Sequence, residues 1–365
     1  MKKLGFGLMR LPVKEDGAID MEHFTKMVDR FMEEGFTYFD TAYPYHGGRS
    51  ESAFGEAVAA RYPRDAYTVT SKMPVFLIEK AEQYPTIFAE QLEKCKVDYF
   101  DYYFLHSLDG KSYEKVKEHR GFEFVNEKKK EGKIKHVGFS YHGNAEDLDR
   151  MLTEHPETEL VQLQINYIDW DDAIIQSGKC YDVCMKHGVQ VSIMEPLKGG
   201  SLATPPEKAA EILKAAAPEL SVASWGIRFA ASLDNVLVVL SGMSSIDQLE
   251  DNMSYMKDFK PLTDKEQATV KDVVKIINDA IAIKCTSCHY CTDGCPMNIA
   301  IPEYFGLYNS QHLYGMGENL KGNFRRLSNG RGLPSECIAC GQCESHCPQH
   351  LPIIENMAKV AEIFG

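Results

Sequence analysis

The sequence predicts an α/β protein in which a (βα)8 TIM barrel is followed by a small, mainly α-helical domain. Over residues 1 to about 260, short apolar runs alternate with amphipathic stretches, and eight such pairs of run and stretch occur there. The amino-acid composition then changes sharply at Lys284. Eight strand–helix units in about 250 residues match the length of a (βα)8 barrel. We therefore assign residues 1–283 to the barrel and residues 284–365 to the second domain. A doubly wound open sheet is the alternative.

Each expected strand is a short run rich in apolar or β-branched residues, as is typical of buried parallel strands. The expected strands are residues 4–8, 37–39, 68–70, 102–105, 136–139, 160–163, 189–193 and 236–240. Apolar residues at helical spacing lie between these runs and predict helices over residues 21–35, 51–61, 78–95, 113–131, 145–154, 173–187, 207–216 and 222–231. Further helices are expected over residues 265–283, 301–314 and 352–364.

The composition is that of an ordinary globular protein, with 44% apolar and 25% charged residues. A net charge of −13 disfavours nucleic acid and anionic membranes as partners. No apolar run approaches the roughly 20 residues that span a bilayer, and the first eight residues are too short and too glycine-rich for a signal peptide. We expect a cytoplasmic protein with no nucleic-acid or membrane partner.

Eight of the 11 cysteines lie after Lys284, in two runs that each hold three cysteines with two residues between neighbours and a fourth followed by proline. In a reducing compartment such a pattern indicates metal rather than disulfides. In two-cluster ferredoxins the fourth cysteine of each run binds the other cluster. We expect one [4Fe–4S] cluster on Cys285, Cys288, Cys291 and Cys347, and a second on Cys337, Cys340, Cys343 and Cys295. Zinc is the alternative, but four-cysteine zinc sites usually consist of two separated pairs.

The remaining cysteines, Cys95, Cys180 and Cys184, lie in amphipathic helical stretches and are expected to pack in the core. The 41 residues between Cys295 and Cys337 are too many for a compact hairpin-built ferredoxin. The C-terminal domain instead resembles the α-helical ferredoxin domain that serves larger oxidoreductases as an electron-transfer module.

Catalytic groups of a βα-barrel follow the carboxyl ends of its strands. Asp40 ends the second expected strand and Tyr45 follows it, while Lys72 and His106 end the next two. A phenol with a pKa near 10 exchanges protons poorly at neutral pH, and an adjacent ammonium lowers that pKa. A carboxylate keeps the ammonium charged, and an imidazole orients a carbonyl. This set is suited to reducing C=O or oxidising an alcohol. The alternative is that these residues have structural roles, with Asp40 capping a helix, Lys72 solvated in a loop and His106 hydrogen-bonded within the protein.

These residues belong to motifs that together resemble the aldo-keto reductase superfamily over essentially residues 1–260. The motifs are Gly5-Phe-Gly-Leu-Met-Arg10, Phe39-Asp-Thr-Ala-x-x-Tyr45, Ser71-Lys72, Asp101-x-x-x-Leu-His106, Gly138-Phe-Ser140, Gln164-x-x-Tyr167, Pro196-Leu-x-Gly-Gly200 and Gly242-Met-Ser-Ser followed by Gln248-Leu-Glu-Asp-Asn252. The resemblance implies Asp40, Tyr45, Lys72 and His106 as a catalytic tetrad, with Tyr45 as the proton donor. Barrel and tail together resemble a bacterial subgroup of this superfamily with a C-terminal ferredoxin domain.

The resemblance also implies a nicotinamide cofactor bound across the rim of the barrel. Ser140 and Gln164 would hold its carboxamide, and Leu197, Gly199 and Gly200 would line the pyrophosphate. Ser244, Gln248, Asp251 and Asn252 would face the adenosine end. Met9, Arg10, Asp40 and Gly242 complete the implied cofactor contacts.

Two departures from the family pattern affect these expectations. Tyr141 stands where the family usually has asparagine, and His142 together with Tyr43 are candidate substrate contacts. Gly242 and Gln248 replace the cationic pair that usually holds a 2′-phosphate, which favours NAD(H) over NADP(H).

Nicotinamide passes two electrons as a hydride, whereas a [4Fe–4S] cluster takes one. One interpretation is an NAD(P)H-dependent oxidoreductase acting on a small carbonyl or alcohol, with clusters that stabilise the tail or sense redox state. A second is an electron-transfer component that relays electrons to or from a redox partner protein or a flavin. A third is a cofactor-sensing binding module, which the intact tetrad disfavours.

Overall fold

The structure is a computed structural model that describes residues 1–172, 175–314 and 318–364. The chain divides into two compact units, one formed by Met1–Pro196 with Ala223–Asp264 and the other by Leu197–Val222 with Lys265–Gly365. The domain boundary expected between residues 283 and 284 was based on the change in composition, whereas the two compact units are defined by contacts within the chain.

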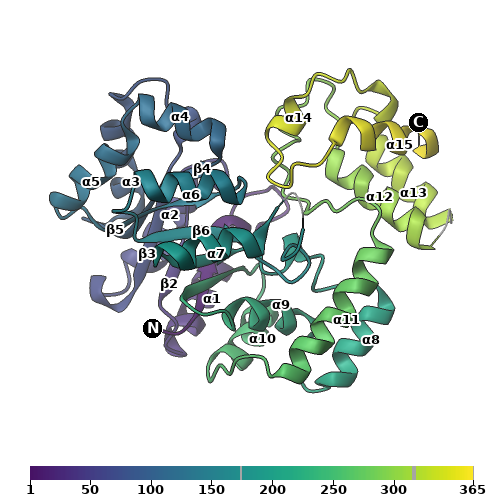
Figure 1. Cartoon of the computed structure of the whole chain (residues 1–365), viewed down its shortest axis with the longest axis horizontal. Coiled ribbons are helices and arrows are strands. Elements are labelled where there is room, and N and C mark those ends of the chain that lie inside the picture. Colours follow the sequence, from purple (N-terminus) through teal and green to yellow (C-terminus); the bar gives the residue numbers. More distant parts are fainter. Residues whose placement is uncertain (173–174, 315–317, 365) are drawn as a thin grey trace. The chain divides into compact units, whose positions relative to one another are not determined.

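The first unit contains a closed barrel of eight parallel strands in sequence order (Figure 1). Each strand pairs with the next, and β8 closes the barrel on β1 with Gly5 opposite Leu240. The predicted (βα)8 fold is confirmed, and the open-sheet alternative is wrong. The strands are β1 (Leu4–Gly7), β2 (Tyr38–Asp40), β3 (Thr68–Met73), β4 (Phe100–Leu108), β5 (Ile134–Tyr141), β6 (Leu160–Gln164), β7 (Gln190–Met194) and β8 (Val236–Gly242).

Helices follow these strands along the chain, most of them close to the expected positions. They are α1 (Met21–Glu33), α2 (Ser50–Phe54), α3 (Gln83–Cys95), α4 (Gly110–Glu118), α5 (Gly121–Lys130), α6 (Ala145–Glu154), α7 (Ser177–His187), α8 (Glu207–Ala216), α9 (Val222–Ala231) and α10 (Ile246–Met256). Of the helix expected over residues 173–187, residues 173 and 174 lie outside the described part of the chain. The helix α10 was not predicted.

The single helix expected over residues 113–131 is wrong. Asp109 and Ser112 form a reciprocal capping box that starts α4, and Arg120 adopts a left-handed conformation with φ 60° between α4 and α5. A left-handed residue cannot continue an α-helix, so the chain forms two shorter helices.

Aromatic packing between the barrel and its first helix shows how the helix spacing buries one face. Phe24 and Phe31 of α1 lie with their ring centroids 5.8 and 5.5 Å from that of Phe6 on β1. Both are fully buried and lie on the same side of α1 as Met27 and Val28. On β5, a Cβ on Gly138 would lie 2.0 Å from the Leu160 carbonyl oxygen, so the close pairing of β5 and β6 requires glycine there.

The second unit is mainly helical in its C-terminal part, as expected for residues 284–365. Its helices after α8 are α11 (Asp264–Ala280), α12 (Ile301–Tyr314), α13 (Glu318–Ser328), α14 (Gln342–Ser345) and α15 (Ile353–Phe364). Apolar side chains of α12 and α15 form its core, including Tyr304, Phe305, Met357 and Val360. The two cysteine runs lie largely in the loops between these helices.

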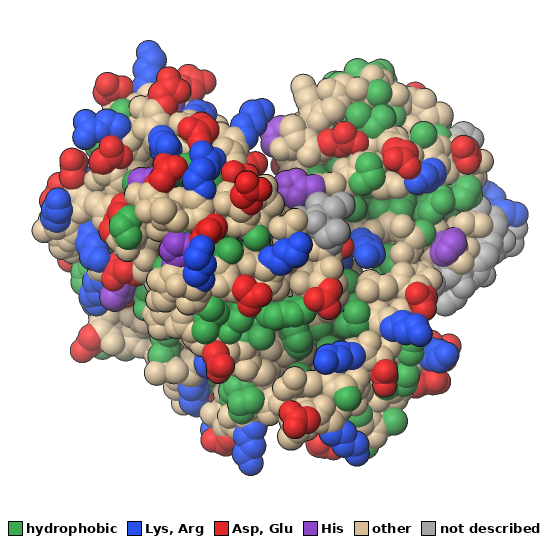
Figure 2. Space-filling view, viewed as in Figure 1, with side chains coloured by type: hydrophobic (Ala, Val, Ile, Leu, Met, Phe, Trp, Pro, Cys, Tyr) green, Lys and Arg blue, Asp and Glu red, His purple; other side chains and the backbone are tan. Residues whose placement is uncertain are grey.

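Among the residues that the structure describes, no helix is long and apolar enough to cross a membrane. Figure 2 shows acidic and basic side chains intermixed over the barrel unit on the face in view, without a continuous basic patch there.

Candidate functional site

Neighbouring strands of the barrel deliver the four rim residues to one place. Asp40 is the last residue of β2, Lys72 lies near the end of β3, and His106 lies in the second half of β4. The register places Asp40 opposite Thr70 and Lys72 opposite Phe104, so Lys72 and His106 each lie two residues beyond the partner of the preceding rim residue. Tyr45 follows β2 in a turn. The structure brings all four residues together, as the sequence predicts.

A buried ion pair is the centre of this site. The Nζ atom of Lys72 lies 2.5 Å from Oδ1 of Asp40 and also donates to the Thr41 carbonyl oxygen at 2.8 Å. Nε2 of Gln162 on β6 donates to the other carboxylate oxygen of Asp40 at 3.1 Å. Burial lowers the pKa of Lys72 against the opposing charge of Asp40, and burial raises the pKa of Asp40. Each partner therefore depends on the other for its charge.

Tyr45 and His106 lie beside this pair. Nζ of Lys72 is 5.2 Å from the ring centroid of Tyr45, and the rings of Tyr45 and His106 meet edge to face at 5.9 Å. Burial lowers the pKa of His106 well below its ordinary value, and the Lys72 ammonium adds to this effect. The buried Nδ1 of His106 has no hydrogen-bond partner in the described structure. Phe76 lies against His106 with ring centroids 5.6 Å apart and is 49% exposed.

A further group of buried polar side chains, from α2 and α3, forms hydrogen bonds to β3. The sequence did not lead us to predict this group. Oε1 of Glu51 accepts hydrogen bonds of 2.6 Å from Ser71 and from Gln91. The Gln91 amide also donates to the Lys72 carbonyl oxygen at 3.0 Å, which fixes the backbone that carries the lysine. Burial raises the pKa of Glu51. Polar residues on the buried faces of α2 and α3 were the available signal. Gln162 was also missed, although it alternates with Gln164 in an apolar strand.

The implied carboxamide contacts lie on neighbouring strands. Ser140 on β5 and Gln164 on β6 are both buried. Oγ of Ser140 accepts from the Ser107 backbone N–H at 2.7 Å, so its hydroxyl proton remains available to a ligand. Nε2 of Gln164 lies 3.4 Å from the carboxylate of Asp169.

The residues implied at the adenosine end surround the ends of β1 and β8. The Arg10 side chain lies against Gly242, where an added Cβ would be 3.2 Å from Arg10 carbon atoms. Ser244 Oγ donates to the Arg10 carbonyl oxygen, and the Ser244 N–H donates to Gln248. Met9 is half-buried and precedes Arg10, while Asp251 lies in α10. Asn252 is buried and hydrogen-bonded to Ser241 and Tyr255, so its side chain faces the protein.

The two candidate substrate residues lie in different surroundings. Tyr43 donates its hydroxyl to Glu90 of α3 at 3.1 Å, and Lys94 lies over its ring, so Tyr43 is held against α3. His142 lies close enough to His106 to contribute to the lowering of its pKa, which places it near the four rim residues. Tyr141, which replaces the usual asparagine, ends β5 and donates its hydroxyl to the Asn144 carbonyl oxygen at 2.6 Å.

Leu197, Gly199 and Gly200 follow β7 along the chain and belong to the second unit. Gly199 has a φ of +66°, and a Cβ there would lie 1.8 Å from the Thr286 carbonyl oxygen. The glycine is therefore required by the loop that carries Cys285, a reason that the sequence motif did not reveal. Lys198 is buried and donates to Gln349 at 3.2 Å.

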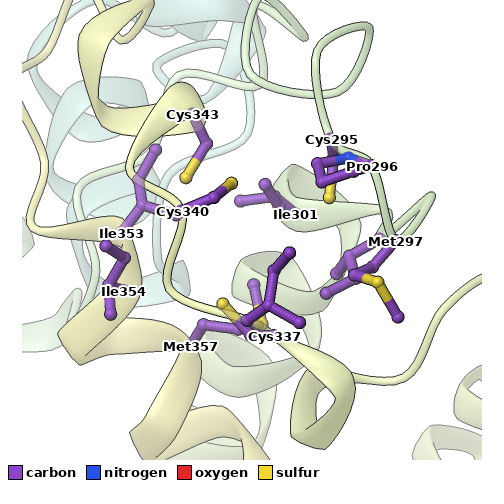
Figure 3. A pocket seen from close by; sticks show the side chains of 12 residues that line it. Cys295, Pro296, Met297, Ile301, Cys337, Cys340, Cys343, Ile353, Ile354 and Met357 are labelled. Carbon is purple, nitrogen blue, oxygen red and sulfur yellow. The ribbon is translucent and has the colours of Figure 1, made fainter.

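The eight C-terminal cysteines line two pockets in the second unit. Cys285, Cys288, Cys291 and Cys347 line one of them. Cys295, Cys337, Cys340 and Cys343 line the other, and Figure 3 shows their side chains around one opening. These are the two groups that the sequence spacing predicts. Among the described residues, no three cysteine, histidine or acidic side chains gather closely enough to hold a single metal ion.

The other three cysteines are buried in the first unit. Burial raises the pKa of Cys180 to about 12 and also raises those of Cys95 and Cys184. They are inert thiols in the core, in agreement with the sequence reasoning.

Comparison with known proteins matches residues 3–275 to the aldo/keto reductase family and residues 284–351 to a 4Fe-4S dicluster domain. The L-galactose dehydrogenase of Arabidopsis thaliana is 26% identical over 304 residues, which make up 75% of this chain and 90% of that protein. The acetyl-CoA decarbonylase/synthase complex subunit alpha 1 of Methanosarcina acetivorans is 31% identical over 102 residues, which are 28% of this chain and 11% of that protein.

Solved structures share the barrel fold. An aldo/keto reductase from Klebsiella pneumoniae, solved in complex with NADP and acetate, superimposes with a TM-score of 0.59 at 20% identity and covers 74% of this chain and 91% of that one. The chain belongs to the aldo/keto reductase family and is an NAD(P)-dependent oxidoreductase that carries a C-terminal 4Fe-4S dicluster domain.

Proposed function

We propose that the protein reduces an aldehyde or ketone with a hydride from NAD(P)H, or oxidises the corresponding alcohol, and that Tyr45 is the general acid. The observation that carries this proposal is the grouping of Tyr45, His106 and the buried pair of Lys72 and Asp40 at the carboxyl ends of β2 to β4. Family membership supports the same chemistry.

The division of labour follows from the contacts. Lys72 places a positive charge 5.2 Å from the Tyr45 ring, which favours the phenolate that forms when Tyr45 gives up its proton. Asp40, held by Gln162, keeps Lys72 charged and in place. The lowered pKa of His106 favours its neutral form, and its ring lies beside that of Tyr45, so the imidazole is suited to orient a carbonyl oxygen.

The exposed ring of Phe76 beside His106 favours a carbonyl compound that carries an apolar or aromatic group. His142 is the second candidate substrate contact. Tyr43 is the weaker one, because Glu90 already binds its hydroxyl.

A bound nicotinamide cofactor supplies the hydride. Ser140 and Gln164 are suited to hold its carboxamide, because both are buried polar side chains on adjacent strands. Leu197, Gly199 and Gly200 are proposed at the pyrophosphate. The remaining proposed cofactor contacts are Met9, Arg10, Asp40, Gly242, Ser244, Gln248, Asp251 and Asn252. Asn252 would contribute through its neighbours, because its own side chain is hydrogen-bonded within the protein.

The C-terminal domain, residues 284–365, is proposed to hold two [4Fe–4S] clusters, one in each cysteine-lined pocket. Two pockets lined by four cysteines each fit clusters better than zinc, because each cysteine run is a triple with a trailing Cys-Pro and not a pair. We place residues 1–283 in the catalytic domain. We also place the protein in the cytoplasm, because cysteine runs that bind clusters suit a reducing compartment.

The dicluster domain favours one second function, that of an electron-transfer component. In this case the clusters would relay single electrons between a flavin or a redox protein and the barrel, which would mainly bind cofactor. Because Asp40, Tyr45, Lys72 and His106 are all present, we favour catalysis by the barrel over this second function.

Replacement of Tyr45 by phenylalanine tests the catalytic assignment. The variant keeps the ring and loses the proton, so we expect NAD(P)H oxidation with small aldehydes and ketones to fall by roughly 10²-fold or more. Tyr99→Phe is the matched control, because Tyr99 precedes β4 at the opposite end of the barrel and contacts Lys135 there. Full turnover in Tyr45→Phe would falsify the role of Tyr45.

The buried imidazole of His106 gives a pH prediction. Burial disfavours the cation, so the proton leaves at a lower pH than in an exposed histidine, which is half protonated near pH 6.5. We expect the NMR signal of His106, assigned with His106→Gln, to stay in its neutral position between about pH 6 and 8. A titration centred at or above about pH 6.5 would show that His106 is not buried as described.

Arg10 tests the cofactor preference. Gly242 and Gln248 offer no charge to a 2′-phosphate, which favours NADH, but the Arg10 side chain lies against Gly242. We expect kcat/KM to be higher for NADH than for NADPH, and Arg10→Gln to weaken the use of NADPH more than that of NADH. Arg49→Gln, whose side chain contacts Gly17, is the matched control. A strong NADPH preference that Arg10→Gln leaves intact would refute both points.

Iron analysis tests the cluster assignment. Eight cysteines in two pockets predict about eight iron and eight acid-labile sulfide per chain, from two clusters of four iron each. Serine in place of Cys340, with Cys180→Ser as control, should remove up to half of the iron. One or two zinc ions without sulfide would contradict the assignment.

A further inference from the structure

The two cysteine-lined pockets differ in the side chains that accompany the cysteines. Every non-cysteine residue lining the pocket of Cys295, Cys337, Cys340 and Cys343 is apolar, namely Pro296, Met297, Ile299, Ile301, Ile338, Ile353, Ile354 and Met357. The pocket of Cys285, Cys288, Cys291 and Cys347 is also lined by Thr286 and Gln349, which are polar. The two pockets therefore offer different surroundings to the same kind of cluster.

Gln349 presents its amide nitrogen without a partner. Nζ of Lys198 donates to Oε1 of Gln349 at 3.2 Å, and both residues are only 3% exposed. A lysine ammonium can only donate, so it must face the amide oxygen, which leaves the two N–H groups of Nε2 to point elsewhere. Nε2 is buried and has no acceptor among the described residues. Lys198 thus sets the direction in which Gln349 donates.

Thr286 offers a second donor of the same kind. It is 1% exposed, and its Oγ1 is buried without a hydrogen-bond partner in the described part of the chain. Its carbonyl oxygen lies where a Cβ of Gly199 would be, so the segment carrying Lys198 packs directly against the residue that follows Cys285. A buried donor without an acceptor costs free energy, which indicates that something absent from the bare polypeptide accepts both hydrogen bonds.

Backbone groups and charge act in the same direction at this pocket. The Ser287 N–H donates to Sγ of Cys285 at 3.4 Å, and the backbone N–H groups of residues 349–351 face Cys347. The positive charge of Lys198 acts on Cys285. At the other pocket, a backbone N–H of Glu344 faces Cys343.

We propose that Gln349 and Thr286 donate to the sulfur atoms of the cluster held by Cys285, Cys288, Cys291 and Cys347, that Lys198 is the positioning residue that orients Gln349, and that together they make this the higher-potential cluster of the two. Hydrogen bonds to sulfur and nearby positive charge stabilise the reduced form, which carries one more negative charge. An electron entering the domain then resides mainly on this cluster. The inference rests on the proposed presence of two clusters.

An anaerobic redox titration of the full-length protein, followed by electron paramagnetic resonance, tests this inference. Gln349→Leu and Lys198→Met should each lower the higher of the two potentials and leave the lower one in place. We expect a roughly tenfold change in the ratio of reduced to oxidised cluster, which is about 59 mV for a one-electron couple. Lys198→Arg keeps the charge and should keep the potential. Met357→Leu, in the apolar pocket, is the matched control.

The outcomes separate the inference from the proposed function. Unchanged potentials in Gln349→Leu and Lys198→Met with about eight iron per chain would overturn the inference, as would a shift confined to the lower-potential cluster. Fewer than about eight iron in the unmodified protein would instead count against the two clusters. If Gln349→Leu fails to load one cluster, Thr286→Val and the comparison of Lys198→Met with Lys198→Arg decide the question in the same titration.

Discussion

The ion pair between Lys72 and Asp40 is the constraint on which the proposed site depends. An isolated charge inside the barrel is too costly, and the pair persists only because Thr41 and Gln162 satisfy the remaining donor and acceptor positions. Removal of one partner from such a pair costs about 3–5 kcal/mol, since the other charge is left buried. The barrel therefore brings side chains from β2, β3 and β6 into contact, and Tyr45 and His106 lie beside the resulting ion pair.

The chain combines two kinds of redox group that transfer different numbers of electrons per step. A nicotinamide delivers a hydride, whereas a cluster accepts one electron at a time. The segment from Leu197 to Gly200 is relevant to both the cofactor and the clusters. The family motif predicts a cofactor loop there, and in the structure Gly199 and Lys198 pack on the cysteine loops of the second unit. Loading of the cluster site and the conformation of this segment are therefore expected to depend on one another.

Much of the architecture is encoded locally and can be predicted from the sequence. All eight strands contain short runs of apolar or β-branched residues, and the four rim residues lie at or just beyond the ends of such runs. The cysteine spacing likewise predicts which four cysteines share each pocket. The features that were missed depend on partners distant in sequence: Gln162 reaches Asp40 across 122 residues, and Lys198 reaches Gln349 across 151. The break between α4 and α5 is local, but it depends on the backbone conformation of Arg120, which no residue pattern indicates.

Transfer of deuterium from the cofactor tests the central claim most directly. NADH deuterated at both C4 positions of the nicotinamide would be mixed anaerobically with the protein and an aromatic aldehyde, and the alcohol formed would be examined by mass spectrometry. Direct hydride transfer beside Tyr45 predicts one deuterium on the carbinol carbon of every product molecule. Alcohol without deuterium, its hydrogen drawn from water, would contradict the account and would place the clusters on the path of the electrons.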